Sequence, residues 1–167
     1  VSFIQSNYMG FGSGIVIDGT GISMQNRGHT FSLDEHHHNK LEPRKKTYHT
    51  IIPGFIMKDQ KPIGPFGVMG GFMQPQGHLQ VLMNMIDFNM NPQEALDAPR
   101  FRWDEGLKVA VEETMNQNLI QQLKEKGHDI QLEPRGSSFG RGQIIIKKDD
   151  HYECGTETRC DGYIAYE

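Results

Sequence analysis

Glycine interrupts this chain so often that the sequence favours many short strands over long helices. Nineteen of the 167 residues are glycine, about 11% against a usual share of about 7%. Glycine adopts turn conformations freely and weakens a helix when it lies inside one. Between the glycines lie short apolar runs, and only two stretches carry a good helical spacing. The chain is therefore expected to combine short strands with few helices.

The two helical stretches are recognised by the period of their apolar residues. The i, i+3, i+4, i+7 pattern of Leu79, Leu82, Met83 and Ile86 predicts one helix after Gly70-Gly71, and a second apolar face predicts another over Glu112–Lys126, ending at Gly127. Asn91-Pro92 indicates a short further helix, because Asn caps a helix start well and Pro suits the first turn. The predicted apolar faces are Leu79, Leu82, Met83 and Ile86 on the first helix, and Met115, Leu119 and Leu123 on the long one.

Short strands account for most of the remaining apolar runs. The turns Asp18-Gly19-Thr20-Gly21 and Lys58-Asp59-Gln60-Lys61 predict two hairpins. Thr30–Lys46 is polar and charged, which is typical of a long surface loop. The pattern predicts an α+β fold in a single domain over residues 1–167, with antiparallel sheets and helices on one face; two sheets between helices would fit. The expected strands are Val1–Ser6, Ile15–Ile17, Ile22–Met24, Thr50–Met57, Pro62–Met69, Leu107–Val111, Ile130–Leu132, Gln143–Lys147 and Tyr163–Tyr166.

Charge and composition exclude several classes of partner. A net charge of −4 and a pI near 6.1 argue against binding to nucleic acid or to an anionic membrane. No apolar run approaches the ~18–20 residues of a transmembrane helix. Cys154 and Cys160 are expected to be free thiols, which leaves the compartment open, with the cytoplasm favoured over the periplasm or secretion. His36-His37-His38 has no neighbouring ligands at metal spacing, so it is interpreted as solvated loop, and no metal or cofactor is expected.

Two glycine-rich segments are the best local candidates for chemistry. Gly70-Gly71 follows a strand-like run and precedes the first predicted helix, which puts two backbone N–H groups near a helix N-terminus. Such donors can form an oxyanion hole, although a turn needed only for packing has the same sequence. The segment Ser6–Gly14 is open to the same two interpretations, a bulged loop or part of a site.

Six short motifs follow one another along the chain. They are Ser6–Ile15, Gly21–Asn26, Pro53–Asp59, Gly70-Gly71, Asn91-Pro92-Gln93-Glu94-Ala95 leading into Asp97-Ala98-Pro99-Arg100-Phe101, and Gly155–Gly162 with Arg159-x-Asp161-Gly162. In residues, order and approximate spacing they resemble the γ-glutamyltransferases (glutathione hydrolases) and their cephalosporin-acylase-like branch. The resemblance extends over essentially the whole chain and is far more specific than any single motif.

The resemblance implies an N-terminal-nucleophile hydrolase, a four-layer αββα sandwich of which this chain is most of the small subunit. In that family a proenzyme cleaves itself, and the new N-terminal Thr becomes the nucleophile with its own amine as base. That Thr would lie about a dozen residues upstream of Val1, one strand and a turn away. The implied partners are the large subunit of the same proenzyme, a small-molecule acyl amide, and an amine acceptor or water. Higher oligomers stay open.

The resemblance also assigns roles to individual residues. Ser6 matches the hydroxyl position that hydrogen-bonds the nucleophile, and Gly70 and Gly71 match the oxyanion-hole glycines. Tyr8 takes the place of a substrate-binding Asn. Arg100 is expected to hold a helix end and its loop, a structural role. The other substrate-binding candidates are Arg27, Thr30, His49 and Thr50.

The acyl pocket departs from the family pattern at two places. The family has an acidic residue that pairs with the substrate ammonium where this chain has Arg27-Gly28-His29-Thr30, and its paired serines are replaced by His49-Thr50. An Arg in place of an acid should repel an ammonium and favour a carboxylate or a neutral acyl tail. The expected activity is cleavage of γ-glutamyl or glutaryl-type amides. The alternative is an inactive homologue or fragment that binds an acyl amide or a partner chain without turnover.

Overall fold

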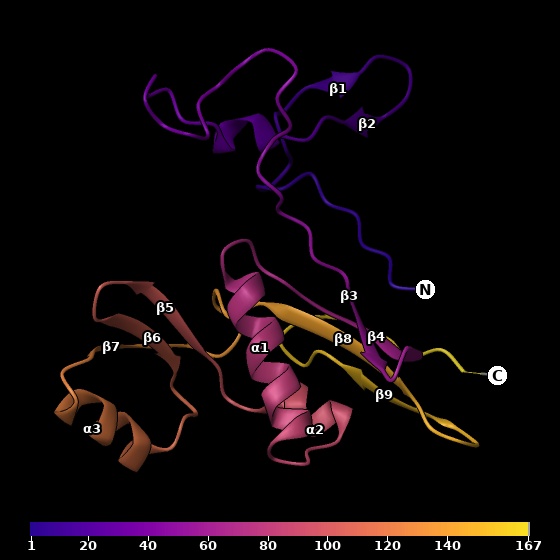
Figure 1. Cartoon of the computed structure of the whole chain (residues 1–167), viewed down its shortest axis with the longest axis vertical. Helices are drawn as coiled ribbons and strands as arrows, with labels where there is room; N and C mark the ends of the chain where they lie inside the picture. The colour runs from indigo at the N-terminus through magenta and orange to yellow at the C-terminus, as the bar shows by residue number, and fades with distance from the viewer. Residues whose placement is uncertain (167) are drawn as a thin grey trace. The chain divides into compact units, whose positions relative to one another are not determined.

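The computed structural model describes residues 1–166, which form two compact units. The N-terminal unit is Phe3–Ile51, and the main unit is Val1–Ser2 together with the chain from Ile52 onwards. Figure 1 labels their helices and strands. The expectation of one domain over residues 1–167 stays a prediction.

A small hairpin and a long loop make up the N-terminal unit. β1 (Val16–Ile17) pairs antiparallel with β2 (Ile22–Ser23), which confirms the predicted hairpin. The amide of Thr20 donates to the carbonyl of Ile17 at 3.1 Å within the turn. A short 3-10 helix, η1 (Arg27–Thr30), follows. Residues 31–46 contain no helix or strand beyond one isolated bridge, as predicted for this loop, whereas the strand predicted from Thr50 begins only at Gly54.

The main unit is built on a four-stranded antiparallel sheet with the order β3-β4-β8-β9. β3 (Gly54–Lys58) and β4 (Lys61–Met69) form the second predicted hairpin. β8 (Arg141–Lys147) pairs with β4, and β9 (Tyr152–Thr156) pairs with β8. β4 is thus an inner strand, and it ends immediately before Gly70.

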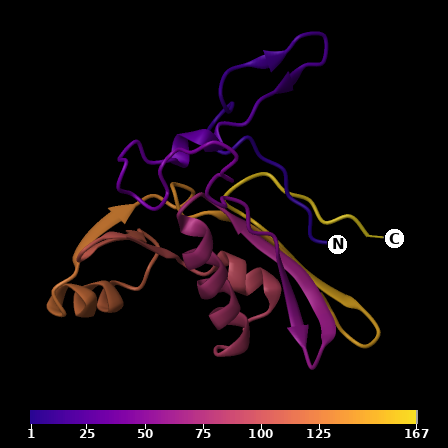
Figure 2. The same cartoon turned by 45° about the horizontal axis from the view of Figure 1, so that its top comes forward.

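Two helices cover one face of this sheet (Figure 2). α1 (Met73–Ile86) packs on β4, and α2 (Pro92–Asp97) packs on β8 and β9. Asn91 and Glu94 cap α2 reciprocally, because each side chain accepts a hydrogen bond from the other residue's amide at 2.9 Å. The core between helices and sheet consists of Phe66, Val68, Val81, Ala95, Leu96 and Ile144.

A second sheet of three strands has the order β5-β6-β7. β5 (Phe101–Glu105) is antiparallel to β6 (Lys108–Glu112), whereas β6 is parallel to β7 (Asp129–Glu133). The prediction of purely antiparallel sheets is therefore wrong here. α3 (Gln117–Glu125) forms the crossover connection that a parallel pair requires. The core under α3 contains Val109, Val111, Met115 and Ile120.

Two glutamines of α1 join that helix to the edge strand β5. The Gln76 side chain accepts from the amide of Trp103 at 2.7 Å and donates to its carbonyl at 3.1 Å. Gln80 makes the same pair of bonds to Phe101, at 3.0 and 2.9 Å. The spacing matches because four helical residues rise about 6 Å and two strand residues about 6.6 Å.

Several predicted element boundaries are wrong. Val1–Ser6 forms no strand, since none of the described strands pairs with it, and Val1 and Phe3 are exposed. Tyr163–Tyr166 forms no strand for the same reason, while β5 and β9 were not predicted. The long helix begins only after Asn116, whose side chain accepts from the amides of the next turn.

The predicted inward face of α1 is wrong for three of its four residues, whereas Leu82 packs against the core as predicted. Leu79, Met83 and Ile86 are 59%, 42% and 66% exposed. The buried residues include Gly77 and Val81, because their side of the helix packs on β4. A Cβ on Gly77 would lie 2.8 Å from a methyl group of Val68, so the helix backbone lies directly on β4.

Candidate active site

Gly70 and Gly71 connect β4 to α1. Their φ angles are +145° and +59°, conformations that strain any residue with a side chain. A Cβ on Gly70 would also lie 3.1 Å from the Cα of Gly140, so the two backbone segments touch. The carbonyls of Gly70 and Gly71 accept hydrogen bonds at 3.1 Å from the amides that begin α1, which fixes the pair to the helix.

The backbone N–H groups of Gly70 and Gly71 donate no hydrogen bond to any residue that the structure describes. β4 ends at Met69 and α1 begins at Met73, so neither group is consumed by sheet or helix. No acidic side chain lies in the first turn of α1, which leaves the positive end of the helix dipole uncompensated there. Two free donors in this position can stabilise an oxyanion.

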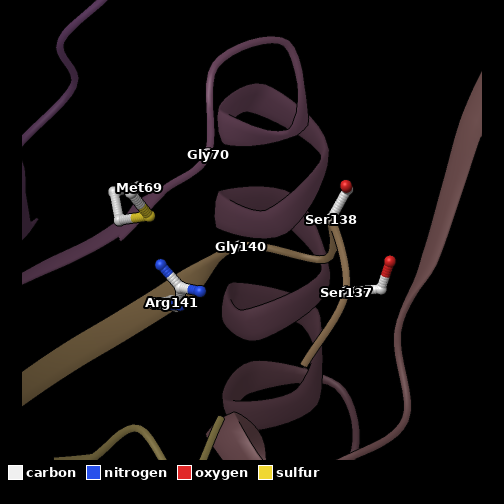
Figure 3. A pocket seen from close by; sticks show the side chains of 6 residues that line it. All are labelled: Met69, Gly70, Ser137, Ser138, Gly140 and Arg141. Carbon is white, nitrogen blue, oxygen red and sulfur yellow. The ribbon is translucent and has the colours of Figure 1, made fainter. Parts of the chain in front are cut away.

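A pocket of about 210 Å³ adjoins Gly70 (Figure 3). Arg141 is its only charged lining residue, and the guanidinium has no hydrogen-bond or ion-pair partner within residues 1–166. The Ser137 hydroxyl donates to Glu133 at 2.9 Å, whereas the hydroxyl of Ser138 has no partner among the described residues. The lining consists of Met69, Gly70, Ser137, Ser138, Gly140 and Arg141.

Buried charges fix the loop that forms one wall of this pocket. Arg100 donates to the carbonyls of Phe139 and Gly140 at 3.1 and 3.0 Å, and to the Glu157 carboxylate at 2.9 Å. Arg100 also donates to the carbonyl of Leu96 near the end of α2 at 3.1 Å, the structural role expected for it. Arg159 completes the cluster by bridging Glu157 at 2.7 Å and Glu112 at 2.6 Å. All four charged side chains are at most 1% exposed.

Glu157 is the centre of this cluster. Burial raises the pKa of its carboxyl, but Arg100, Arg159 and the amide of Gly142 together lower that pKa below its ordinary value. The amide of Gly142 donates to the carboxylate at 2.8 Å. The carboxylate therefore stays ionised and holds the backbone on the C-terminal side of Arg141, while Arg100 holds Gly140 on the other side.

In the N-terminal unit, Arg27 joins two other predicted site residues. Its Nε donates to the Thr50 hydroxyl at 2.7 Å, and its Nη2 donates to the Ser6 hydroxyl at 2.9 Å and to the Ser6 carbonyl at 3.1 Å. The structure thus brings Ser6, Arg27 and Thr50 into one hydrogen-bonded group. The guanidinium supplies a fixed positive charge beside two hydroxyls.

The side chains of the other three candidates, Tyr8, Thr30 and His49, form no hydrogen bond with the Arg27 guanidinium within residues 1–166, although the amide of Tyr8 donates to the Ser6 hydroxyl at 3.3 Å. Tyr8 adopts a φ of +79°, which is uncommon for a residue with a side chain. The Thr30 hydroxyl donates to the carbonyl of Arg27 at 2.7 Å and so closes η1. His49 is exposed and makes no hydrogen bond to another described residue.

Sequence reasoning singled out Gly70 but missed the other residues that line the pocket. Ser137 and Ser138 follow Gly136 in the loop before β8, and Arg141 is the first residue of that strand. Gly-Ser segments are typical of turns in general. Only the folded backbone brings this loop against Gly70. The convergence of Gly70 and Gly71 with Ser6 joins residues of different units and stays a prediction.

The histidine run, the two cysteines and the apolar segments were the other features considered in the sequence. Among residues 1–166, no group of three His, Cys, Asp or Glu side chains could hold a metal ion. His37 and His38 stack on each other in an exposed loop, with ring centroids 4.3 Å apart. Cys154 and Cys160 are free thiols, as predicted. Within the same part of the chain, no helix has the length and apolar character needed to cross a membrane.

Comparison with known proteins gives consistent matches over the whole chain. The family model described as Gamma-glutamyltranspeptidase matches residues 1–167. The Glutathione hydrolase-like YwrD proenzyme of Bacillus subtilis is 40% identical over 171 aligned positions, which cover 97% of this chain and 32% of that protein. The Oxamate amidohydrolase proenzyme of Klebsiella pneumoniae is 34% identical over 172 positions, covering 99% of this chain and 33% of the relative.

A solved structure matches the fold closely. Cephalosporin acylase from Bacillus halodurans superposes with a TM-score of 0.93 at 60% identity, over 98% of this chain and 31% of the acylase chain. The chain thus spans about a third of the length of these relatives. Together with the mixed helices and sheets, the match confirms the predicted α+β fold of the N-terminal-nucleophile hydrolase type.

Proposed function

The chain belongs to the γ-glutamyltranspeptidase family, and we propose that it forms part of an enzyme that cleaves acyl amides through an acyl-enzyme. The observation that supports this most directly is the pair of free N–H groups at Gly70 and Gly71, beside a pocket at the start of α1. The expected substrates are γ-glutamyl or glutaryl-type amides. Relatives bear the names glutathione hydrolase-like, oxamate amidohydrolase and cephalosporin acylase.

In the proposed mechanism, the nucleophile is an N-terminal Thr from a segment that precedes Val1 in the full-length protein. Its own amine takes the hydroxyl proton, and the oxygen attacks the amide carbonyl. The N–H groups of Gly70 and Gly71 bind the resulting oxyanion, and the Ser6 hydroxyl orients the nucleophile. Collapse of the tetrahedral intermediate releases the amine, and water or an amine acceptor then takes the acyl group.

The proposed partner is the large subunit of the same proenzyme. The curated relatives are proenzymes of about three times this length. Separately solved chains of similar fold have nearly the extent of this chain: it covers 93% of one from Helicobacter pylori γ-glutamyltranspeptidase, at a TM-score of 0.85 and 26% identity. This supports the assignment of residues 1–167 to most of a small subunit.

The acyl preference follows from the charge held by Arg27. The guanidinium is fixed by Ser6 and Thr50, so the acyl pocket receives a cation where a γ-glutamyl ammonium would need an acid. An ammonium without a partner would lose a charge-assisted hydrogen bond of about 1.5–3 kcal/mol, roughly 10–150-fold in kcat/KM. The enzyme is therefore expected to prefer a glutaryl amide to the matching γ-glutamyl amide.

The test uses the purified full-length protein with glutaryl and γ-glutamyl p-nitroanilides. Gly70→Ala forces the peptide out of its φ of +145°, because alanine does not adopt that conformation and its methyl group meets Gly140. The expected loss in kcat is about 10²–10³-fold. Gly106→Ala is the matched control, since Gly106 also has a positive φ but open space around it.

Two results would count against the proposed function. If Gly70→Ala and Gly106→Ala lose the same factor in kcat, and this loss parallels their loss of thermal stability, the oxyanion role is contradicted. A wild-type protein that keeps its proenzyme mass and cleaves neither anilide would favour the alternative, a homologue that binds without turnover.

A further inference from the structure

Arg141 is a charged side chain with an environment suited to a ligand. It is the first residue of β8, directly opposite Met69 in the antiparallel ladder, so the two side chains lie on the same face of the sheet. Figure 3 shows both on one side of Gly140, with the two serines on the other. No described residue forms an ion pair or hydrogen bond with the guanidinium.

The pocket lining has the chemistry of an anion site. Among residues 1–166 it contains one cation, the unpartnered Ser138 hydroxyl and the free N–H of Gly70, and no acidic residue. The carboxylate that touches the lining, Glu133, is already neutralised by Arg102, with a distance of 2.9 Å between Nη2 and Oε1. Arg102 holds the pKa of the Glu133 carboxyl below its ordinary value, so this acid remains ionised and committed to that pair.

The backbone around Arg141 is fixed on both sides. Gly140 is held by Arg100, and Gly142 is held by Glu157, at 3.0 and 2.8 Å respectively. The buried ion pairs therefore determine the position of the Arg141 backbone, while its side chain remains exposed and free to bind. A positioned guanidinium can bind a carboxylate through two parallel hydrogen bonds.

We propose that Arg141, with the Ser138 hydroxyl, forms a carboxylate-binding subsite beside Gly70. The inference rests on the proposed amide cleavage, and it assigns a specificity residue to that reaction. At about 210 Å³ the pocket is smaller than the ~300–1,000 Å³ of sites for whole drug-sized ligands, so it accommodates one carboxylate-bearing arm. Met69 provides apolar surface for the methylene groups of that arm.

The carboxylate can belong to the acyl group or to the leaving amine, and three anilides, compared in two pairs, distinguish the two. Glutaryl and valeryl p-nitroanilides differ in the acyl carboxylate. Glutaryl p-nitroanilide and glutaryl 3-carboxy-4-nitroanilide differ in the leaving-group carboxylate. In the full-length enzyme, Arg141→Gln should lower kcat/KM roughly 10–100-fold, mainly through KM, for the substrates that carry the bound carboxylate. These are the two glutaryl anilides if that carboxylate belongs to the acyl group, and the 3-carboxy-4-nitroanilide alone if it belongs to the leaving amine. The partner substrate without it should change less than threefold.

Lys147→Gln is the matched control. Lys147 lies on the same strand and face as Arg141, is exposed, and has no ion-pair partner among residues 1–166. This variant should leave the kcat/KM of all three anilides unchanged. Equal effects of Arg141→Gln on all three anilides, or no effect on any, would overturn the proposal.

Binding of glutarate, measured by calorimetry, provides a readout that does not depend on turnover. The proposal requires Arg141→Gln to weaken glutarate binding at least tenfold, whereas Lys147→Gln retains it. If the wild-type enzyme cleaves none of the anilides, the proposed function fails, and the glutarate measurement still decides on the subsite. Equal glutarate affinity in wild type and Arg141→Gln would overturn it.

Discussion

Four charged side chains are buried together in one cluster, which consists of Arg100, Arg159, Glu112 and Glu157. Each residue is desolvated there, and each is stabilised by its ion pairs and hydrogen bonds. Taking four charges out of water is unfavourable, and the mutual bonds compensate only if every partner is present. Each carboxylate here receives bonds from a guanidinium and from a backbone amide. The cluster is therefore sensitive to the loss of any one member.

Glu157→Gln should destabilise the protein by about 3 kcal/mol, because it leaves two buried guanidiniums sharing one carboxylate. The free energy of unfolding in urea measures this. Glu153→Gln is the control: Glu153 pairs with Lys148 at 3.3 Å in a partly exposed position, and its loss should cost less than about 1 kcal/mol. Similar losses in both variants would contradict the account.

Arg27→Gln should shift the substrate preference toward the γ-glutamyl anilide, since it removes the fixed cation but keeps a side chain that can reach Ser6 and Thr50. The measurement is the ratio of kcat/KM for the glutaryl and γ-glutamyl p-nitroanilides, with an expected change of about tenfold. Arg44→Gln, an exposed arginine of the same unit, should leave the ratio unchanged. A ratio unaffected by Arg27→Gln would remove Arg27 from acyl recognition.

Single-residue roles were predictable to different degrees for physical reasons. Arg27, Ser6 and Thr50 could be singled out because they occupy motif positions, although their mutual hydrogen bonds could not be read from the sequence. Arg141 could not be singled out, because its importance depends on an empty pocket and on the absence of a partner. Neither property leaves a local pattern in the sequence.

At the scale of elements, α1 lies close to β4 because Gly77 has no side chain. Gly77→Ala should lower stability by about 1–3 kcal/mol through overpacking against Val68, although alanine favours a helix by about 1 kcal/mol over glycine. Thermal or urea unfolding measures the change. Gly28→Ala is the control, because Gly28 has an ordinary φ and nothing within 4 Å of an added methyl group. Stabilisation by Gly77→Ala would refute the close-packing argument.

Local signals predicted elements where local chemistry determines them. Both hairpins were predictable from their turn residues, and the start of α2 from Asn91-Pro92. The inward face of α1 was not, because its apolar residues occur on both sides and packing against β4 selects Val81 over Leu79. The parallel pairing of β6 with β7 depends on the length of the crossover through α3, which the apolar pattern alone does not reveal.

At the scale of the whole molecule, several carboxyls titrate below their ordinary range. Glu157 does so despite burial, and hydrogen bonds from Arg102 lower the pKa of Glu133 and Asp104. Such groups stabilise the fold above their unfolded pKa of about 4, and this contribution is lost as the pH falls through their lower folded values. The free energy of unfolding should stay level from pH 7 to about 5 and decrease below about 4. Urea titrations across this range measure it, and a stability that increases below pH 4 would contradict the assignment.

The overall fold class was predictable because the period of apolar residues changes clearly between strands and helices. The strand expected at Val1–Ser6 was not found, because a strand depends on a neighbour and none of the described strands provides one. The role of a segment can thus be indicated by a motif while its conformation depends on partners elsewhere. In this chain, the N-terminal residues carry a motif but form no strand, whereas the strand that precedes Gly70 forms as predicted.

The glutamines that bind β5 have a consequence for the behaviour of the protein in concentrated solution. β5 is an edge strand with partly exposed Phe101 and Trp103, the kind of edge that can recruit a strand from another molecule. The side-chain amides of Gln76 and Gln80 occupy its outward N–H and C=O groups at these two residues, as a neighbouring strand would. Resistance to aggregation along this edge therefore resides in two residues of α1 that have no part in the proposed chemistry.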